Sequence, residues 1–298
     1  MNITRGTFVG LLTGICLGLA GFFLSVHGGK EMGIVLFIAT PFITGFAIAL
    51  VTQPKEGLLS VLVLTLLISM TILLFTQLEG LLCCILSSPV LIASMGIGAG
   101  IGILLRRKTN LRPYDTTLRI LILLILPLLL QGADTIERPT LLKARTESFT
   151  DSIILNTKAD KVWKLLSSID QITVPKPWPM YVGLYQPLRC TISAQKVGAT
   201  RICYFTEGAI YERVTVWEAP KRMHLEIIKS TLPGRPWMGY IDANYKLIER
   251  GNTTELIRTT TITSKLAPEW YWQTFERIGV HTEHEYLFAE IKKRIEAS

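Results

Sequence analysis

The stretch that decides the fold is VGATRICYFTEGAIYERVTVWEAPKRMHLEII, residues 197–228. It contains three runs rich in β-branched and aromatic residues, at 199–205, 209–217 and 222–228. Turn-forming combinations separate the runs, with a Gly at 208 and a Pro at 220. We therefore expect three short antiparallel strands whose apolar face is covered by another element.

The covering element is predicted at the end of the chain. A helical pattern opens at Pro268 and continues to Ile295. A curved sheet that grips one long helix encloses a cavity, and apolar walls suit such a cavity to a hydrophobic small molecule. The candidate cavity residues are Glu212, Trp217, Tyr245, Trp272, Phe275, Ile278, His281 and Thr282.

Three segments resemble the START-like superfamily, also called SRPBCC or polyketide cyclase/dehydrase-like. They are SIILNTKADKVWKLLSSID at 152–170, the central stretch quoted above, and the final strand and helix at 255–295. The resemblance covers roughly residues 145–295. It implies an α+β helix-grip fold, in which an antiparallel sheet of six or seven strands surrounds a long C-terminal helix. It leaves the function open, because the superfamily mixes lipid carriers, receptors and cyclases.

Residues 1–133 are predicted to form a membrane region. Residues 1–133 carry 8 Lys and Arg and 4 Asp and Glu, against 23 and 19 in residues 134–298. We expect a transmembrane helical region over 1–133, a polar linker over 134–147 and the START-like domain over 148–298. Five apolar segments are long enough to cross about 30 Å of hydrocarbon. They are residues 8–26, 32–51, 58–76, 80–105 and 118–133.

Positive charge orients these segments. Seven Lys and Arg residues fall on the side of the N-terminus and one, Lys30, on the other side. This bias places the N-terminus in the cytoplasm of a bacterial inner-membrane protein and the C-terminal domain outside. A cleavable signal peptide is the rival interpretation of the first segment. Small residues such as Gly96 and Gly100 in the fourth segment serve helix packing inside the chain or a homo-oligomer.

The sequence offers little that points to catalysis. No nucleophile motif, phosphate loop or metal-ligand spacing is present, so we expect no metal and no cofactor. His281 and His284 lie three residues apart and are expected to be structural, at the surface or beside the cavity. Lys and Arg do not cluster with aromatic residues, so no nucleic-acid partner is expected.

A disulfide is predicted between Cys190 and Cys203. If the hairpin turns midway between Lys196 and Val197, the two cysteines lie opposite each other. An oxidising compartment would favour the bond, and two free thiols are the alternative.

The predicted function is a membrane-anchored binding protein for a hydrophobic or lipid-like molecule. One alternative is a cyclase or dehydratase, for which Glu212 with His281 or His284 is the one acid–base pair available. The other is a membrane sensor or scaffold that reports the presence of a ligand.

Overall fold

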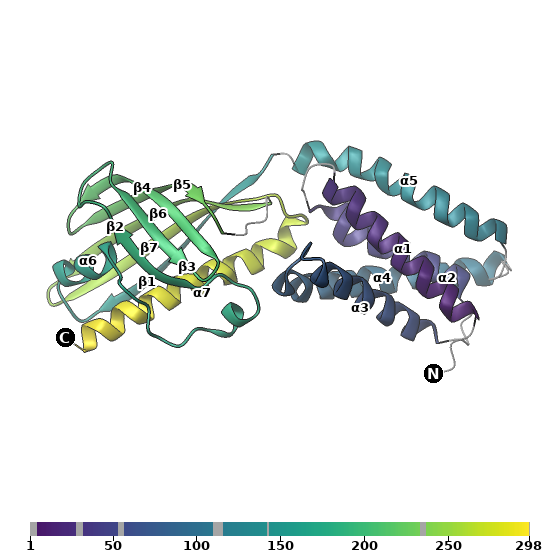
Figure 1. Ribbon diagram of the computed structural model, residues 1–298, viewed down its shortest axis with the longest axis horizontal. Coiled ribbons are helices and arrows are strands. Elements are labelled where there is room, and N and C mark those ends of the chain that lie inside the picture. The colour runs from purple at the N-terminus through teal and green to yellow at the C-terminus, as the bar shows by residue number, and fades with distance from the viewer. Residues whose placement is uncertain are drawn as a thin grey trace. The chain divides into compact units, whose positions relative to one another are not determined.

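The computed structural model describes residues 5–27, 32–52, 57–109, 116–141, 143–232 and 237–297. The chain divides into two compact units. One comprises Met1–Lys143 with Lys265–Glu269, and the other comprises Ala144–Ser264 with Trp270–Ser298. The first unit is helical, and the second combines a sheet with helices (Figure 1).

The helical unit contains three helices that are long and apolar enough to cross a membrane. The apolar stretches are Gly6–Ser25, Leu58–Phe75 and Leu81–Lys108. They belong to α1 (Arg5–His27), α3 (Leu58–Phe75) and α4 (Leu81–Thr109). Only 11% of the α3 window is buried, so its leucines and isoleucines form an apolar outer surface. These helices indicate that the protein associates with a membrane.

Among the described residues, the structure thus supports three spans rather than the predicted five. The second predicted segment divides into a π-helix, η1 (Val35–Ala39), and α2 (Thr40–Val51), which together are shorter than the other spans. The fifth lies in α5 (Thr116–Leu141), and the side chains of residues 116–120, 122 and 123 lie outside the described part. Within the predicted linker, α5 continues to Leu141 and β1 begins at Arg145.

Helices α2 and α4 pack with their backbones in close contact. A Cβ atom on Gly45 of α2 would lie 2.0 Å from the carbonyl oxygen of Met95. One on Gly98 of α4 would lie 2.0 Å from the carbonyl oxygen of Phe42. Gly96 and Gly100 meet nothing within 4 Å among the described atoms. Part of the small-residue stripe in α4 therefore serves packing within the chain.

The second unit is built on a seven-stranded antiparallel sheet with the order β1-β7-β6-β5-β4-β3-β2. The strands are β1 (Arg145–Leu155), β2 (Pro187–Ile192), β3 (Thr200–Phe205), β4 (Gly208–Glu218), β5 (Arg222–Ser230), β6 (Met238–Arg250) and β7 (Thr253–Ser264). After the first strand, α6 (Ala159–Ser167) precedes a short 3-10 helix, η3 (Trp178–Tyr181). The long helix α7 (Glu269–Glu296) ends the unit.

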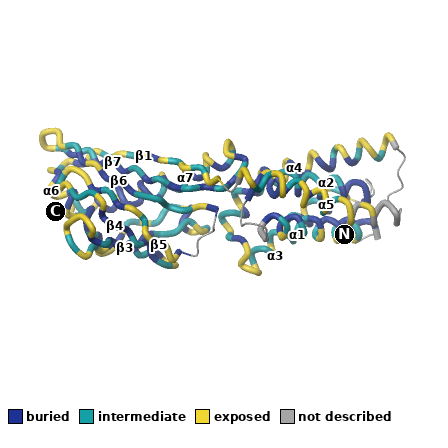
Figure 2. Tube along the Cα trace, turned by 90° about the horizontal axis from the view of Figure 1, so that it is seen from above, coloured by how far each residue is buried: buried dark blue, intermediate teal, exposed yellow. Residues whose placement is uncertain are grey.

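The sheet curls around α7, an arrangement consistent with the helix-grip fold (Figure 1). The core between them includes Leu225, Leu256, Leu287, Phe288 and Ile291, all nearly inaccessible to solvent. Burial alternates residue by residue along β7, as expected for a strand with one face covered (Figure 2). The expected meander is confirmed, with each strand boundary shifted by at most a few residues.

Candidate functional site

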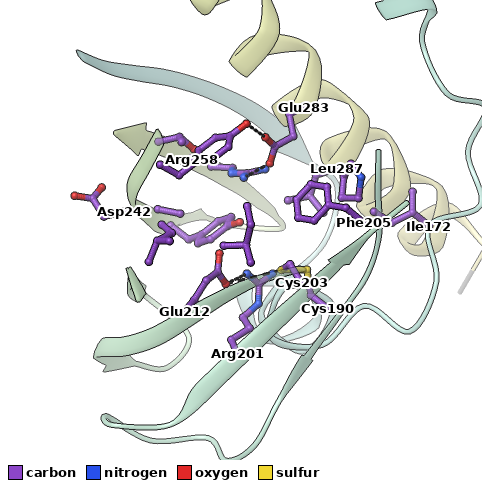
Figure 3. Close-up of a pocket in the computed structure, with 17 residues that line it drawn as sticks. Ile172, Cys190, Arg201, Cys203, Phe205, Glu212, Asp242, Arg258, Glu283 and Leu287 are labelled. Atoms are coloured by element: carbon purple, nitrogen blue, oxygen red, sulfur yellow. Dashed lines mark hydrogen bonds and ion pairs between the residues drawn. A yellow bond between two sulfur atoms is a disulfide. The ribbon is translucent and has the colours of Figure 1, made fainter. Parts of the chain in front are cut away.

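A small cavity lies between the curved sheet and α7 (Figure 3). Its volume is about 30 Å³, which is room for about two water molecules. Phe205, Ile210, Ile227 and Leu287 give it an apolar part. The rest of its lining contains charged side chains, of which Glu212 was expected from the sequence and the others were not.

The first charged pair joins two neighbouring strands. Arg201 of β3 and Glu212 of β4 are register partners, and both face the interior because burial alternates along each strand. The Nη1 atom of Arg201 donates to Oε2 of Glu212 at 2.6 Å. The side chains are 1% and 8% exposed, so the pair is almost completely removed from water. Such a pair is stable only when the two charges neutralise each other.

The second charged pair joins the sheet to the helix. The Nη2 atom of Arg258 on β7 donates to Oε1 of Glu283 on α7 at 2.7 Å. Tyr240 of β6 donates its hydroxyl to Oε2 of the same glutamate at 3.1 Å. Both carboxylate oxygens of Glu283 are therefore engaged.

A tyrosine lies between the two pairs. The ring centre of Tyr245 is 5.9 Å from the guanidinium carbon of Arg201 and 5.4 Å from that of Arg258. Both distances permit cation–π attraction, and the ring is 1% exposed. Tyr245 thus contacts both guanidinium groups, and Arg258 still acts to lower the pKa of Arg201 through the repulsion of like charges.

The charges of this cluster follow from its environment. Burial acts to raise the pKa of Glu283, but Arg258 and the hydrogen bonds from Arg258 and Tyr240 outweigh it, so the pKa lies below its usual value. Burial acts to lower the pKa of Arg201, and the neighbouring Glu212 reverses this effect. Burial, together with Glu283, raises the pKa of Tyr240 well above its usual value. Glu283 is therefore ionised and Tyr240 is a neutral donor at neutral pH.

A disulfide forms part of the cavity wall. Cys190 of β2 and Cys203 of β3 are register partners with a Cα–Cα distance of 4.1 Å, and they are bonded to each other. Both line the cavity, and Sγ of Cys203 lies 3.8 Å from Oε2 of Glu212. The bond fixes the edge strand β2 to its neighbour beside the Arg201–Glu212 pair.

Helix α7 is held by three buried glutamates spaced seven residues apart, two of which contact strands and one the loop between α6 and η3. Glu276 accepts from Nη2 of Arg145 at 2.7 and 2.6 Å, and from the hydroxyl of Ser264 at 2.6 Å. Glu283 binds Arg258 as described above. Glu290 accepts from the backbone N–H groups of Thr173 and Val174 at 2.7 and 3.1 Å. A seven-residue spacing returns to the same face of a helix, so these carboxylates define the packed face of α7.

A second contact between α7 and the sheet uses histidines. The Nδ1 atoms of His281 and His284 lie 2.8 and 2.6 Å from the two carboxylate oxygens of Asp151 on β1. His284 also contacts the hydroxyl of Thr260 through Nε2 at 2.7 Å. Burial and the positive charge of Arg258 lower the pKa of His284 to about 4, so it is neutral at pH 7. Within the described part of the chain, no group of three or more His, Cys, Asp or Glu is placed to hold a metal.

Two of the eight predicted cavity residues, Glu212 and Tyr245, line the cavity. Ile278 is 47% exposed, and the side chain of His281 is 54% exposed. The hydroxyl of Thr282 donates to the backbone of its own helix. Ile278, His281 and Thr282 do not line this cavity, because the buried face of α7 passes instead through Glu276, Val280, Glu283 and Leu287.

Three other predicted aromatic residues, Trp217, Trp272 and Phe275, do not line this cavity. Trp217 packs on Trp163, with ring centres 5.0 Å apart. A bulge between Val214 and Val216 shifts the alternation of β4 and turns this tryptophan into the core. Trp272 and Phe275 contact Tyr271 near the start of α7. They are packing residues of the helix rather than part of the cavity wall.

The acid–base pair considered for a cyclase is also corrected. Glu212 is paired with Arg201, whereas His281 and His284 are both paired with Asp151. The residues that sequence reasoning missed are Arg201, Arg258 and Glu283. Strand alternation contained the signal for Arg258, because it falls in phase with Leu256 and Ile262 in the final strand.

Comparison with known proteins gives fold neighbours only. No family model matches the chain, and no curated protein matches its sequence. Among solved structures, norcoclaurine synthase from Thalictrum flavum is similar, with 14% identity and a TM-score of 0.36, over 52% of this chain and 89% of that one. A START superfamily protein from Mycobacterium smegmatis is similar with 12% identity and a TM-score of 0.36, over 50% of this chain and 97% of that one.

Proposed function

We propose that this chain is a membrane-associated binding protein for a hydrophobic or lipid-like small molecule held between the curved sheet and α7. The observation that carries the proposal is the cavity itself. It combines aliphatic and aromatic walls with a few polar groups that converge on one place, which is the usual composition of a small-molecule site. The apolar helices of the first unit would keep the binding unit beside a reservoir of such molecules.

The volume of the cavity sets a condition on this function. About 30 Å³ is far below the roughly 300–1,000 Å³ of typical ligand pockets. A ligand larger than a few atoms therefore requires α7 to separate from the sheet. The charged and polar contacts of α7 are suited to such a movement, because water can solvate their partners when the helix lifts.

A test of binding uses a cavity-filling variant of the full chain. Ala243 lines the cavity and is 4% exposed, so Ala243→Leu occupies the remaining space. Lys246→Leu introduces the same apolar side chain at an exposed position of the same strand and is the control. The proteins are purified from membranes in nanodiscs, and mass spectrometry identifies the small molecules that co-purify. We expect Ala243→Leu to lose a molecule that the wild type and Lys246→Leu retain. Equal recovery from all three proteins would contradict the proposal.

We further propose that the binding unit lies outside the cytoplasm. The Cys190–Cys203 disulfide supports this placement, since such bonds persist in oxidising compartments. An alkaline phosphatase fused after Arg145 should be active, and a reporter that requires the cytoplasm should be silent there. The reverse result would place the unit in the cytoplasm.

A further inference from the structure

The two charged pairs of the cavity differ in how fully their hydrogen-bonding groups are used. Both oxygens of Glu283 accept hydrogen bonds, from Arg258 and from Tyr240. Glu212 accepts its side-chain hydrogen bond on Oε2, and among the described residues Oε1 has no donor. The Nε–H groups of Arg201 and Arg258 are both buried and have no acceptor within the same part of the chain, so the two pairs differ at the carboxylate. The Arg201–Glu212 pair therefore has one unused donor and one unused acceptor.

Charge balance limits what can occupy this place. Two guanidinium groups and two carboxylates already neutralise each other in the lining. Asp242 also lines the cavity, with a side chain 25% exposed and Oδ2 3.8 Å from Nε2 of His224. An anionic ligand would bring an additional negative charge to these carboxylates, and a cationic ligand would be repelled by both arginines. Burying an uncompensated charge is costly, so an uncharged polar group is favoured.

We infer that the ligand carries an uncharged hydroxyl group at its polar end, which accepts from the Nε–H of Arg201 and donates to Oε1 of Glu212. A hydroxyl matches both unused groups at once, because it is a donor and an acceptor. A ketone or ester would satisfy the arginine alone. The hydrocarbon body of the ligand then packs against Phe205, Ile210 and Ile227. This inference rests on the proposed binding function and names the chemical class of the ligand.

The test compares four probes that share one hydrocarbon chain: decanol, decane, decanoate and decylamine. Binding to the full chain is measured by calorimetry in a fluorinated surfactant, which does not mix with hydrocarbon. We expect decanol to bind about tenfold more tightly than each of the other three, because hydrogen bonds to charged groups give about this factor. Tighter binding of decanoate or decylamine overturns the inference and leaves the binding function standing. Absence of binding by all four overturns both.

Variants at the pair add a second readout. Glu212→Gln removes one negative charge, so the order should reverse and decanoate should bind more tightly than decanol. Arg213→Gln, at an exposed position of the same strand, should keep the wild-type order. Because Glu212→Gln can impair folding, the double variant Arg201→Met with Glu212→Met is also measured, with circular dichroism on each protein. The double variant should bind decanol and decane equally. A preference for decanol that survives in the double variant overturns the inference.

Discussion

Arg258 of β7 donates to Glu283 of α7 across 2.7 Å, and each side chain is 9% exposed. This pair connects the helix to the sheet in the wall of the cavity. An ion pair so far from water stabilises the fold only while both members are present, since either charge alone has no solvent to replace its partner.

We therefore expect Glu283→Gln to weaken the attachment of α7. Loss of one partner of a buried pair costs about 3–5 kcal/mol. Hydrogen exchange of the α7 backbone amides in the full chain measures the effect as faster local opening. The double variant Arg258→Met with Glu283→Met should lose less of the stability of this attachment, because it leaves no unpaired charge. Equal losses in the single and double variants would contradict this account.

Acid should destabilise the second unit in two stages. His284 has a pKa of about 4 in the folded state and an ordinary value of 6.5. Between these values the unfolded chain binds a proton that the folded chain does not, so stability falls as the pH drops from 6.5 to 4. The slope approaches about 1.4 kcal/mol per pH unit. The lowered pKa values of Glu283 and Asp151 add a further loss at lower pH, where these carboxylates become protonated.

The control for this pH dependence is the neighbouring histidine. His284→Gln should remove the loss between pH 6.5 and 4, whereas His281→Gln should keep it, because His281 is half exposed. Denaturation of the full chain at a series of pH values, followed by tryptophan fluorescence, separates the two variants. An unchanged profile in His284→Gln would show that another group is responsible.

Reduction of the disulfide should destabilise the edge of the sheet. The bond closes a loop with a sequence separation of 13 residues, which corresponds to about 3 kcal/mol in the chain-entropy model. We expect Cys190→Ala with Cys203→Ala to show faster hydrogen exchange in β2 than in β6. Treatment with dithiothreitol should reproduce this result in the wild type and have no further effect on the double variant. Unchanged exchange in β2 would show that the bond contributes little.

The glycines of α4 should divide into two groups. Gly98→Ala places a methyl group against the backbone of Phe42, so it should separate α2 from α4 and lower the thermal stability of the helical unit in detergent. Gly100→Ala meets open space and should leave this stability unchanged or slightly raised, since alanine favours helix. Similar losses in both variants would indicate that Gly100 has a packing partner, such as a second copy of the chain.

Most of the fold could be predicted from the sequence because each strand has a local pattern. Turn residues such as Gly208 and Pro220 marked the ends of strands, and the two cysteines could be placed opposite each other by counting from the turn. These features depend on short-range geometry. The apolar helices were predictable for a similar reason, although apolar length alone overestimated the number of spans.

The candidate site was less predictable because its chemistry depends on contacts between distant segments. Arg258 and Glu283 are separated by 25 residues. In the sequence, each of them by itself looks like an ordinary solvated charge. In α7 the apolar pattern favoured Ile278, but the helix buries Glu276 and Glu283 instead. A charged residue is expected inside only when its partner is known, and the sequence did not show which residues were partners.

The spacing of the three buried glutamates restricts how α7 can move. Glu276 and Glu283 have partners on β1 and β7, and Glu290 has its partners in the loop between α6 and η3. Seven residues of helix correspond to about 10.5 Å. If α7 slid along its axis by one turn, all three carboxylates would lose their partners together, and the next matching position is two turns away. Lateral lifting of α7 breaks the same contacts but exposes the charged groups that made them to water. If a ligand is to enter as proposed, this spacing favours an outward swing of α7 over sliding, and a return to the same register on closing.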